Sequence, residues 1–200
     1  MRLKGYDYSR PGAYFVTIVT KDRSCLFGNI VGGKMKPNSA GEAIEHWWLE
    51  LSKKFPTVTT DEFVIMPNHL HGIIITVGAD LRVGPSTPRT DPYPDHQVAV
   101  ATHQGADGGP THRSAPTGAP LPTIVQWFKT MSTNAYISGV QNLGWTPFRG
   151  HLWQRNYYEH IVRSEGSLNR IRQYILDNPA RWAFDRENPV ARVIEPDGPY

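Results

Sequence analysis

The sequence predicts an α+β fold in which a small antiparallel sheet carries helices packed on one face. Three observations predict this class. Short runs of β-branched and aromatic residues have the length of strands. Longer segments repeat their apolar residues at helical spacing. Along the chain the elements follow as strand, helix, two strands, helix, short extended segment and helices, which suits one layered domain.

The first part of the chain predicts a strand, a hairpin and a helix. Residues 13–20 (AYFVTIVT) are β-branched and aromatic, which is typical of a strand. Residues 26–36 contain a Gly-Gly turn and suggest a short hairpin. Residues 39–55 repeat apolar side chains at helical spacing, and Ser39 with Glu42 three residues later resembles a capping box. A helix is therefore expected there, ending before Pro56.

The second part predicts two strands and several helices. Residues 62–66 and 69–77 have strand composition and are separated by Pro67-Asn68, which is turn material. Residues 151–156 suggest a short extended segment. The helical patterns cover residues 123–137, 157–164 and 167–178.

One segment, at about residues 78–122, differs in composition from the rest. It holds 6 glycines and 8 prolines, 14 of its 45 positions, and Tyr93 is its only aromatic residue. Such a segment cannot bury enough apolar surface to offset its ordering entropy. We therefore expect residues 1–200 to form a single domain that is interrupted by a flexible Gly/Pro-rich insertion.

Composition and charge set the broad class. With 21 Lys and Arg against 18 Asp and Glu, the net charge of +3 is compatible with a nucleic-acid partner. The single cysteine, Cys25, excludes an intrachain disulfide and favours a reducing compartment. The first residues lack the apolar stretch of a signal peptide, and the longest apolar run, residues 73–77, is too short to span a bilayer. We expect a cytoplasmic protein without a membrane partner.

The motif MPNHLHGIIIT (residues 66–76) places two histidines at the head of an apolar strand. Side chains alternate between the faces of a strand, so His69 and His71 share one face while Leu70 points toward the core. Two imidazoles on one face can converge on a metal ion. On spacing alone, a more modest explanation is two polar residues on a solvated sheet face. A third ligand would have to come from elsewhere in the chain.

The segment 167–182 (SLNRIRQYILDNPARW) offers such a ligand. Tyr174 and Asn178 are four residues apart, so they share one helix face. A metal held by His69, His71 and Asn178 would have only neutral ligands and would keep its full charge toward a phosphate. Equally, Tyr174 could pack in the core and Asn178 could simply end the helix. Residue type alone does not separate Tyr174 from Tyr157 and Tyr158 as the reactive tyrosine.

These motifs resemble a known family. MPNHLHGIIIT is similar to the histidine–hydrophobic–histidine (HUH) motif of single-tyrosine transposases. Together with VQWFKTM, LWQRNYYEHIVR and RIRQYILDNPARW, the sequence looks like the REP-associated tyrosine transposases, relatives of small insertion-sequence transposases. The resemblance runs from YSRPGAYFVT to NPARW and omits the insertion.

The resemblance implies a ferredoxin-like antiparallel sheet with the HUH motif on a central strand. It implies a cytoplasmic, nucleoid-associated endonuclease and strand transferase that uses Mg or Mn on single-stranded DNA, at hairpin-forming repetitive palindromic sequences. By motif position, Tyr174 would be the nucleophile that forms a 5′-phosphotyrosine, and His69 and His71 would be metal ligands. Asn178 stands where related enzymes carry a glutamine ligand. Relatives include monomers and dimers, so a homodimer remains open.

Binding of DNA would need cations for phosphates and aromatic rings for bases. A solvated surface charge, or for His160 a structural histidine, is the alternative for each candidate cation. The candidates are Lys129, Arg155, His160, Arg163 and Arg170. The alternative function is a non-catalytic module that binds single-stranded nucleic acid on an RNA-recognition-like sheet. Such a module would present solvent-facing aromatic residues on its central strands and would have no use for His69 and His71.

Overall fold

The computed structural model describes residues 7–8, 10–77 and 118–191 of the 200-residue chain. The insertion expected at 78–122 lies outside the described residues except for its last five positions. Two of these positions, Leu121 and Pro122, already belong to the helix that was expected from residue 123, because this helix begins at Leu121. The flexibility of the insertion stays a prediction.

A four-stranded antiparallel sheet forms the centre of the molecule, with the strand order β4-β5-β1-β6. Its elements follow one another as β1 (Gly12–Val19), α1 (Ser39–Lys54), β4 (Val58–Ile65), β5 (His69–Thr76), α2 (Leu121–Leu143) and β6 (Tyr158–Val162). This βαββαβ order with the first and third strands at the centre is the ferredoxin-like topology. The expected fold class, and the place of the histidine motif on a central strand, are confirmed.

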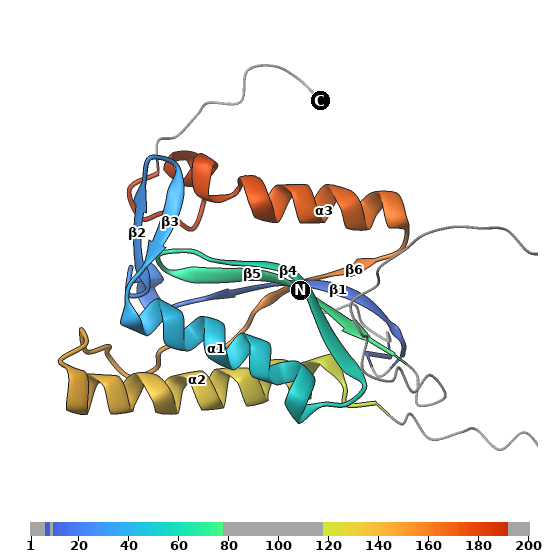
Figure 1. Cartoon of the computed structure of the whole chain (residues 1–200), viewed down its shortest axis with the longest axis horizontal. Coiled ribbons are helices and arrows are strands. Elements are labelled where there is room, and N and C mark those ends of the chain that lie inside the picture. The colour runs from blue at the N-terminus through green and yellow to red at the C-terminus, as the bar shows by residue number, and fades with distance from the viewer. Residues whose placement is uncertain (1–6, 9, 78–117, 192–200) are drawn as a thin grey trace, which may run out of the picture.

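Further elements extend this framework. A hairpin of β2 (Gly28–Val31) and β3 (Lys34–Pro37) follows the short 3-10 turn η1 (Lys21–Arg23). After β6 the chain forms α3 (Glu165–Asp177) and the 3-10 segment η2 (Pro179–Phe184). Figure 1 shows the hairpin standing at one end of the sheet, where it reaches η2.

The helices do not all lie on one face of the sheet, which corrects the expectation. Figure 1 shows α1 and α2 on one face and α3 on the other. Side chains alternate between the two faces of β1, which explains both layers. Val16 and Ile18 pack under α1 and α2. Phe15 points to the other face and packs with Ile73 of β5 and Ile175 of α3. The second layer matters for function, since α3 covers the face that carries the two histidines.

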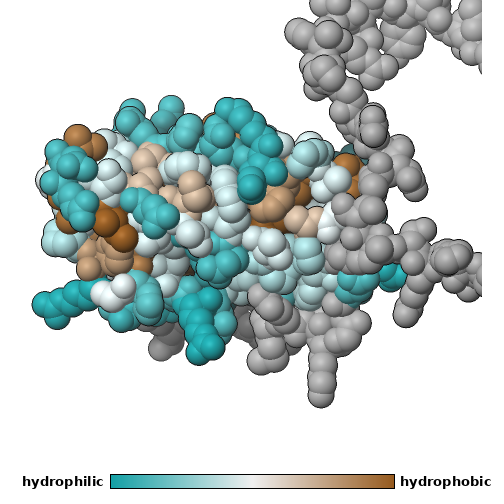
Figure 2. All heavy atoms as spheres, turned by 90° about the horizontal axis from the view of Figure 1, so that it is seen from below, coloured by the Kyte–Doolittle hydropathy of each residue, from teal (hydrophilic) through white to brown (hydrophobic). Residues whose placement is uncertain are grey.

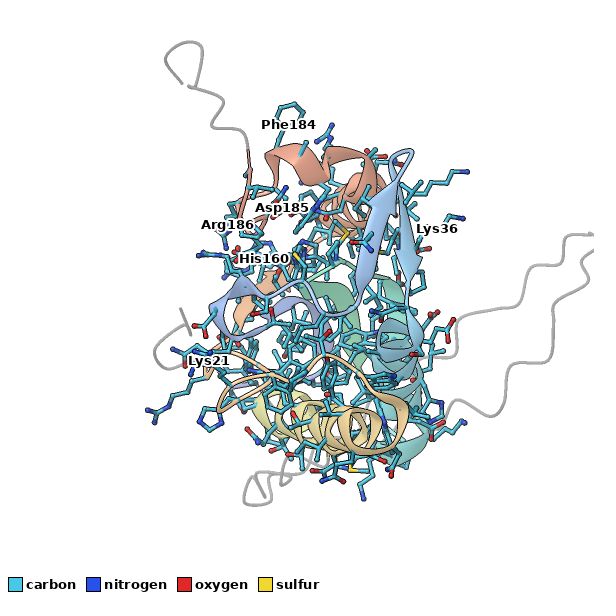
Figure 3. The ribbon with its side chains drawn as sticks, turned by 90° about the vertical axis from the view of Figure 1, so that its left-hand side faces the viewer. Lys21, Lys36, His160, Phe184, Asp185 and Arg186 are labelled. Carbon is cyan, nitrogen blue, oxygen red and sulfur yellow. The ribbon has the colours of Figure 1, made fainter. Side chains whose placement is uncertain are left out.

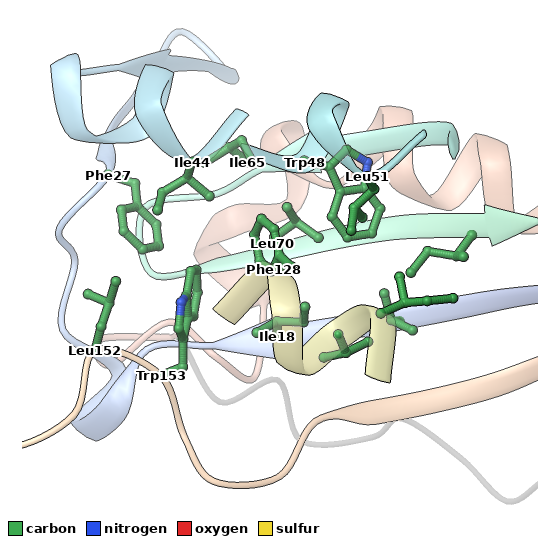
Figure 4. Packing of buried hydrophobic residues seen from close by; sticks show 14 of the residues in the cluster. Ile18, Phe27, Ile44, Trp48, Leu51, Ile65, Leu70, Phe128, Leu152 and Trp153 are labelled. Carbon is green, nitrogen blue, oxygen red and sulfur yellow. The ribbon is translucent and has the colours of Figure 1, made fainter. Parts of the chain in front are cut away.

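The main core lies between the sheet and the helices α1 and α2. Trp48 of α1, Phe128 of α2 and Leu70 of β5 are fully buried there (Figure 4). The outer surface of the same helices combines hydrophilic side chains with scattered hydrophobic ones (Figure 2). None of the helices in the described ranges has an apolar stretch that could cross a bilayer.

Local details differ from expectation in three places. Asn38, rather than Ser39, caps α1, because its side chain accepts a hydrogen bond from the backbone N–H of Gly41 at 2.9 Å. Residues 151–156 form no strand and contribute only a bridge between Trp153 and Thr20. Residues 157–164, expected as a helix, contain the edge strand β6, whose pairing with β1 overrides the helical pattern.

The close packing of α1 on β5 predicts that Gly72 tolerates no side chain. A Cβ at this position would overlap the indole ring of Trp48, which is fully buried and cannot yield. We expect Gly72→Ala to lower the free energy of unfolding by about 1–3 kcal/mol, as for other overpacked sites. Urea unfolding followed by circular dichroism measures it. The matched control is Gly12→Ala in β1, where a Cβ would meet Tyr14 at an ordinary 3.7 Å. Equal stability of the two variants would contradict the packing argument.

Candidate active site

The two histidines of β5 form the centre of the candidate site. His69 is fully buried, His71 is 4% exposed, and their Nε2 atoms lie 3.1 Å apart. The two histidines therefore do not lie on a solvated sheet face, the alternative that spacing alone allowed, because α3 and η2 cover this face. Two buried imidazoles on a central strand need hydrogen-bond partners or a bound cation to offset the free energy of their desolvation.

The ring of His69 is oriented by the side chain of Asn68. The Nδ2 of Asn68 donates to the carbonyl oxygens of Arg23 at 3.0 Å and of Glu187 at 2.6 Å. The Oδ1 of Asn68 is therefore an acceptor, and it lies 2.8 Å from Nδ1 of His69. Nδ1 must carry the proton, which leaves the lone pair on Nε2 of His69 free for a metal.

The ring of His71 has a comparable support. The hydroxyl Oγ1 of Thr17 on β1 lies 2.8 Å from Nδ1 of His71. The ring of Phe15 stacks on the His71 ring with a centroid distance of 5.5 Å. When Nδ1 of His71 donates to Thr17, Nε2 of His71 presents a second lone pair beside that of His69. Hydrogen-bonded second nitrogens of this kind are typical of histidines that bind metals.

Burial keeps both imidazoles neutral. Desolvation, assisted by the nearby Arg186, lowers the pKa of His69 to about 3. Desolvation, followed by the neighbouring His69, also holds the pKa of His71 well below its ordinary value. Neutral imidazole is the form that binds metal ions, so no proton has to leave at neutral pH before a cation binds.

A third candidate ligand, Asp185, comes from the segment after η2. Its Oδ1 accepts from the backbone N–H of Glu187 at 2.7 Å, and its Oδ2 lies 3.9 Å from Nε2 of His69. Ligand atoms of His69, His71 and Asp185 all lie within 4.8 Å of one another. Two imidazole nitrogens and one carboxylate oxygen are a donor set that fits Mn or a related divalent cation. The ligands expected from the sequence, His69, His71 and Asn178, are all neutral. A carboxylate ligand differs from them, because it would offset part of the charge of a bound cation.

Asn178, the ligand expected on α3, lies in the same pocket. It caps the C-terminus of α3 and is 2% exposed, and its Oδ1 has no hydrogen-bond partner among the described residues. A buried carbonyl oxygen without a partner is costly, and a cation would satisfy it. Its role as a ligand stays a proposal that this observation supports.

Tyr174 stands over the histidines from α3. Its hydroxyl lies 3.3 Å from Nε2 of His71, and its ring meets Phe15 edge-on at a centroid distance of 5.9 Å. Partial burial, followed by the charge of Asp185, raises the pKa of Tyr174, whereas Arg186 and Asn178 act in the opposite direction. The phenol is therefore protonated at neutral pH. Of the three tyrosines that sequence alone left open, Tyr174 is the one beside the histidines.

The helix that carries Tyr174 is held by a small apolar contact and one ion pair. Ile175 packs on Phe15 and Ile73 of the sheet. Arg172 donates from Nε and Nη2 to the two carboxylate oxygens of Asp61 on β4, at 2.8 and 2.6 Å. A bidentate pair of this kind fixes orientation as well as distance, so the position of Tyr174 along the sheet depends on it.

A pocket of about 610 Å³ opens beside these groups. Its walls bring together β1, β5, β6, α3 and η2. The lining residues are Phe15, Thr17, His71, Tyr158, Tyr174, Asn178, Arg181, Phe184, Asp185, Arg186 and Glu187. Figure 3 looks onto this end of the molecule and shows Phe184, Asp185 and Arg186 near one another, with His160 below them. The site therefore has buried candidate ligands and an open wall.

The expected DNA contacts fall in different places. Lys129 lies on α2, across the sheet, and its Nζ donates to the carbonyl oxygens of Gln154 at 2.9 Å and of Asn156 at 3.2 Å, so it ties down residues of its own chain. His160 and Arg163 line a second pocket beside Tyr158, and Arg155 and Arg170 are exposed. Roles in DNA binding stay predictions for all five residues, and the bonds of Lys129 show in addition that it holds residues of its own chain.

Several residues of the site have no signal in the sequence patterns. Asp185 follows a 3-10 segment, and its distance along the chain from the histidines gives no spacing to detect. Thr17 reaches His71 only through the pairing of β1 with β5. Asn68 is different, because its position directly before His69 in the motif could have identified it as a support for the imidazole.

The bonds of Asn68 predict that it controls metal affinity without being a ligand. We expect Asn68→Ala to weaken Mn binding about 10- to 100-fold, because the His69 ring loses its orienting partner. His69→Ala should abolish specific binding. Isothermal titration of the purified protein with MnCl₂ measures both. The control Asn142→Ala removes an exposed amide from the far end of α2 and should bind as the wild type does. Unchanged affinity in Asn68→Ala would refute the role.

The two neutral imidazoles also predict how stability depends on pH when no metal is present. Their pKa values are lowered in the folded protein, so below the ordinary value of 6.5 the unfolded chain binds more protons than the folded one. Stability is full above pH 6.5 and falls below it, by about 1.4 kcal/mol per pH unit for each histidine. Urea unfolding in EDTA at pH 7, 6 and 5 tests this against the double variant His69→Gln/His71→Gln. Parallel pH profiles would show that these histidines are not responsible.

Comparisons with known proteins place the chain. No protein-family model matches it. An uncharacterised protein of Haemophilus influenzae is 35% identical over 189 residues, which is 93% of this chain and 90% of that protein. The structure of a REP-associated tyrosine transposase bound to a REP hairpin aligns with a TM-score of 0.50 and 16% identity, over 90% of this chain and 74% of that one. A candidate transposase from Deinococcus radiodurans aligns with a TM-score of 0.42 and 16% identity, over 88% of this chain and 96% of that one.

The comparison of sequences and the comparison of structures support different conclusions. Identity of 35% over nearly the whole of both chains shows common family membership, whereas the structural likeness at 16% identity shows the fold. The chain thus belongs to the same family as the Haemophilus influenzae protein, and its fold is that of the REP-associated tyrosine transposase, as its motifs suggested.

Proposed function

We propose that the protein is a metal-dependent tyrosine transposase that cleaves and rejoins single-stranded DNA at hairpin-forming repetitive palindromic sequences. One observation carries the proposal. The hydroxyl of Tyr174 lies 3.3 Å from Nε2 of His71, at the edge of a cluster in which His69, His71 and Asp185 could hold a cation. A nucleophile beside a cation site is the arrangement that attack on a phosphodiester needs.

The proposed reaction is a transesterification. The phenolate oxygen of Tyr174 attacks phosphorus, a 5′-phosphotyrosine bond forms, and the bond to the 3′-oxygen breaks. The leaving 3′-oxygen takes up a proton and departs as a hydroxyl. The phosphotyrosine keeps the number of phosphoester bonds unchanged, so a second 3′-hydroxyl can displace the tyrosine and join strands without ATP.

The chain's own residues prepare this step. The pKa of Tyr174 is raised by burial and by Asp185, so the phenol must lose its proton to a base as it attacks. Arg186 and Asn178 lower the same pKa and stabilise the phenolate. A divalent cation held by the two imidazoles and Asp185, with Asn178 as a further proposed ligand, would supply Lewis-acid polarisation of the scissile phosphate. Asn68 and Thr17 keep the imidazoles oriented for it.

DNA is the partner that the comparison suggests. The structurally similar REP-associated tyrosine transposase is bound to a REP hairpin. In the present chain, Arg181 and Arg186 line the pocket beside Tyr174 and are suited to bind phosphates. A site with one tyrosine can cut only one strand in each reaction cycle, which suits a single-stranded DNA substrate. A single chain already brings Tyr174 to its own His71, although a homodimer remains compatible with this arrangement.

The geometry disfavours the non-catalytic alternative. An RNA-recognition-like module uses an open sheet face with aromatic residues on its central strands. Here α3 covers that face of β1 and β5, and Phe15 is only 8% exposed beneath it. Such a module would have exposed side chains at these positions of the central strand. Here they are the buried residues His69 and His71, and nucleic-acid binding alone does not explain why two histidines are buried there.

A covalent adduct tests the proposal. We expect the protein, incubated with single-stranded hairpin DNA and MnCl₂, to form a protein–DNA adduct that survives denaturing electrophoresis. The adduct should disappear in Tyr174→Phe, because the nucleophile is lost. The matched control is Tyr158→Phe, which removes another hydroxyl from the same pocket and should still form the adduct. DNA binding without an adduct in either Mn or Mg would refute the enzymatic function.

A further inference from the structure

The open wall of the active-site pocket is aromatic. In the described part of the chain, three Phe, Tyr or Trp side chains are exposed: Tyr158 at 43%, Tyr174 at 41% and Phe184 at 54%. All three line this one pocket. Tyr174 has a proposed chemical role, which leaves Tyr158 and Phe184 unexplained by the reaction.

These two rings do not serve the core. Tyr158 projects from the edge strand β6 and touches Phe15 only edge-on, at a centroid distance of 6.3 Å. Phe184 ends η2, directly before Asp185, and its ring points outward in Figure 3. Exposing large apolar rings is unfavourable, and their concentration around the pocket beside the candidate metal ligands indicates a ligand that covers them.

Both rings are attached to fixed backbone. The residue Tyr158 pairs with Thr17 of β1, the same residue whose hydroxyl contacts His71. After Phe184, the backbone N–H of Asp185 donates to the carbonyl of Trp182 at 3.1 Å, and Asn188 Nδ2 donates to the same carbonyl at 2.9 Å. The backbone that carries the rings is therefore held relative to the candidate metal ligands, and only the side chains have to be ordered when a flat ligand binds.

The two arginines of the pocket are suited to the phosphates of a nucleotide chain. Arg181 and Arg186 line the pocket together with Phe184, so guanidinium groups accompany its flat apolar rings. Asp185 and Glu187 line it as well, and Glu187 pairs with Arg186 at 3.0 Å. Aromatic rings beside cations are the usual means of binding single strands, in which the bases are free to stack and the phosphates need charge. Bases of a duplex already stack on one another and cannot use such rings.

We propose that Tyr158 and Phe184 stack unpaired bases next to the phosphate that Tyr174 attacks. The inference rests on the proposed function and refines it, because it makes the immediate substrate of the pocket an unpaired stretch rather than the stem of a hairpin. Each ring contributes to holding the strand in register with the nucleophile.

Binding measurements that need no cleavage test this directly. In the Tyr174→Phe background, we expect Tyr158→Ala and Phe184→Ala each to weaken binding of single-stranded DNA roughly 10-fold. Tyr158→Phe should bind as well as its parent, because the ring remains. The matched control is Leu176→Ala, which removes an exposed apolar side chain of α3 that does not line the pocket. Fluorescence anisotropy of a labelled oligonucleotide measures all of them.

A double-mutant cycle separates stacking from a loss of fold. Abasic substitutions are placed one at a time beside the cleavage position, and each DNA is tested with each variant. An abasic site that removes the stacked base should abolish most of the effect of the Ala variant, whereas structural damage would weaken every DNA equally. Equal weakening of intact and abasic DNA at every position would overturn the proposal. A failure of the wild type to form an adduct would overturn the proposed reaction and leave the result of this binding cycle intact.

Discussion

The site depends on the alternation of side chains along β5. Leu70 points into the core under α1 and α2, and Gly72 leaves room there for the ring of Trp48. The intervening positions place His69 and His71 on the opposite face with their Nε2 atoms 3.1 Å apart. A shift of one residue in register would turn the histidines into the main core and move Leu70 to the face beneath α3. The close contact between Gly72 and Trp48 thus helps to fix the register that places both histidines on the opposite face.

The parts of the site that follow a regular period could be predicted from the sequence. Alternation placed the two histidines on one face, and helical spacing placed Tyr174 and Asn178 on one face of α3. The sequence patterns could not show that these two faces meet. That contact depends on α3 crossing the sheet on the side opposite to α1 and α2, where Ile175 and the pair of Arg172 with Asp61 hold it.

The rest of the site depends on contacts between distant segments, which local patterns do not contain. Residues 158–162 resembled a helix, yet pairing with β1 makes them a strand and brings Tyr158 to the pocket. Asp185 reaches His69 because Asn68 binds the carbonyl of Glu187 and thereby fixes the segment that carries the carboxylate. A single amide therefore orients one candidate ligand and positions another, although nothing in the composition of either segment relates them.

The candidate site has a buried part and an open part, and the proposed reaction on a phosphodiester needs both. The imidazoles are buried, neutral and fixed by Asn68 and Thr17, so little reorganisation is required when a cation binds. Tyr174 and the rings of Tyr158 and Phe184 are open to solvent, so the proposed polymer substrate could reach them. Asp185 lies between these two parts and has two opposing effects: its charge would attract a cation, and it raises the pKa of Tyr174, the proposed nucleophile. A divalent cation held there would oppose the second effect, because its charge exceeds that of one carboxylate. In the proposed function, the same carboxylate therefore adds to the effect of burial in disfavouring the phenolate, and it would also help to hold the cation that favours the phenolate.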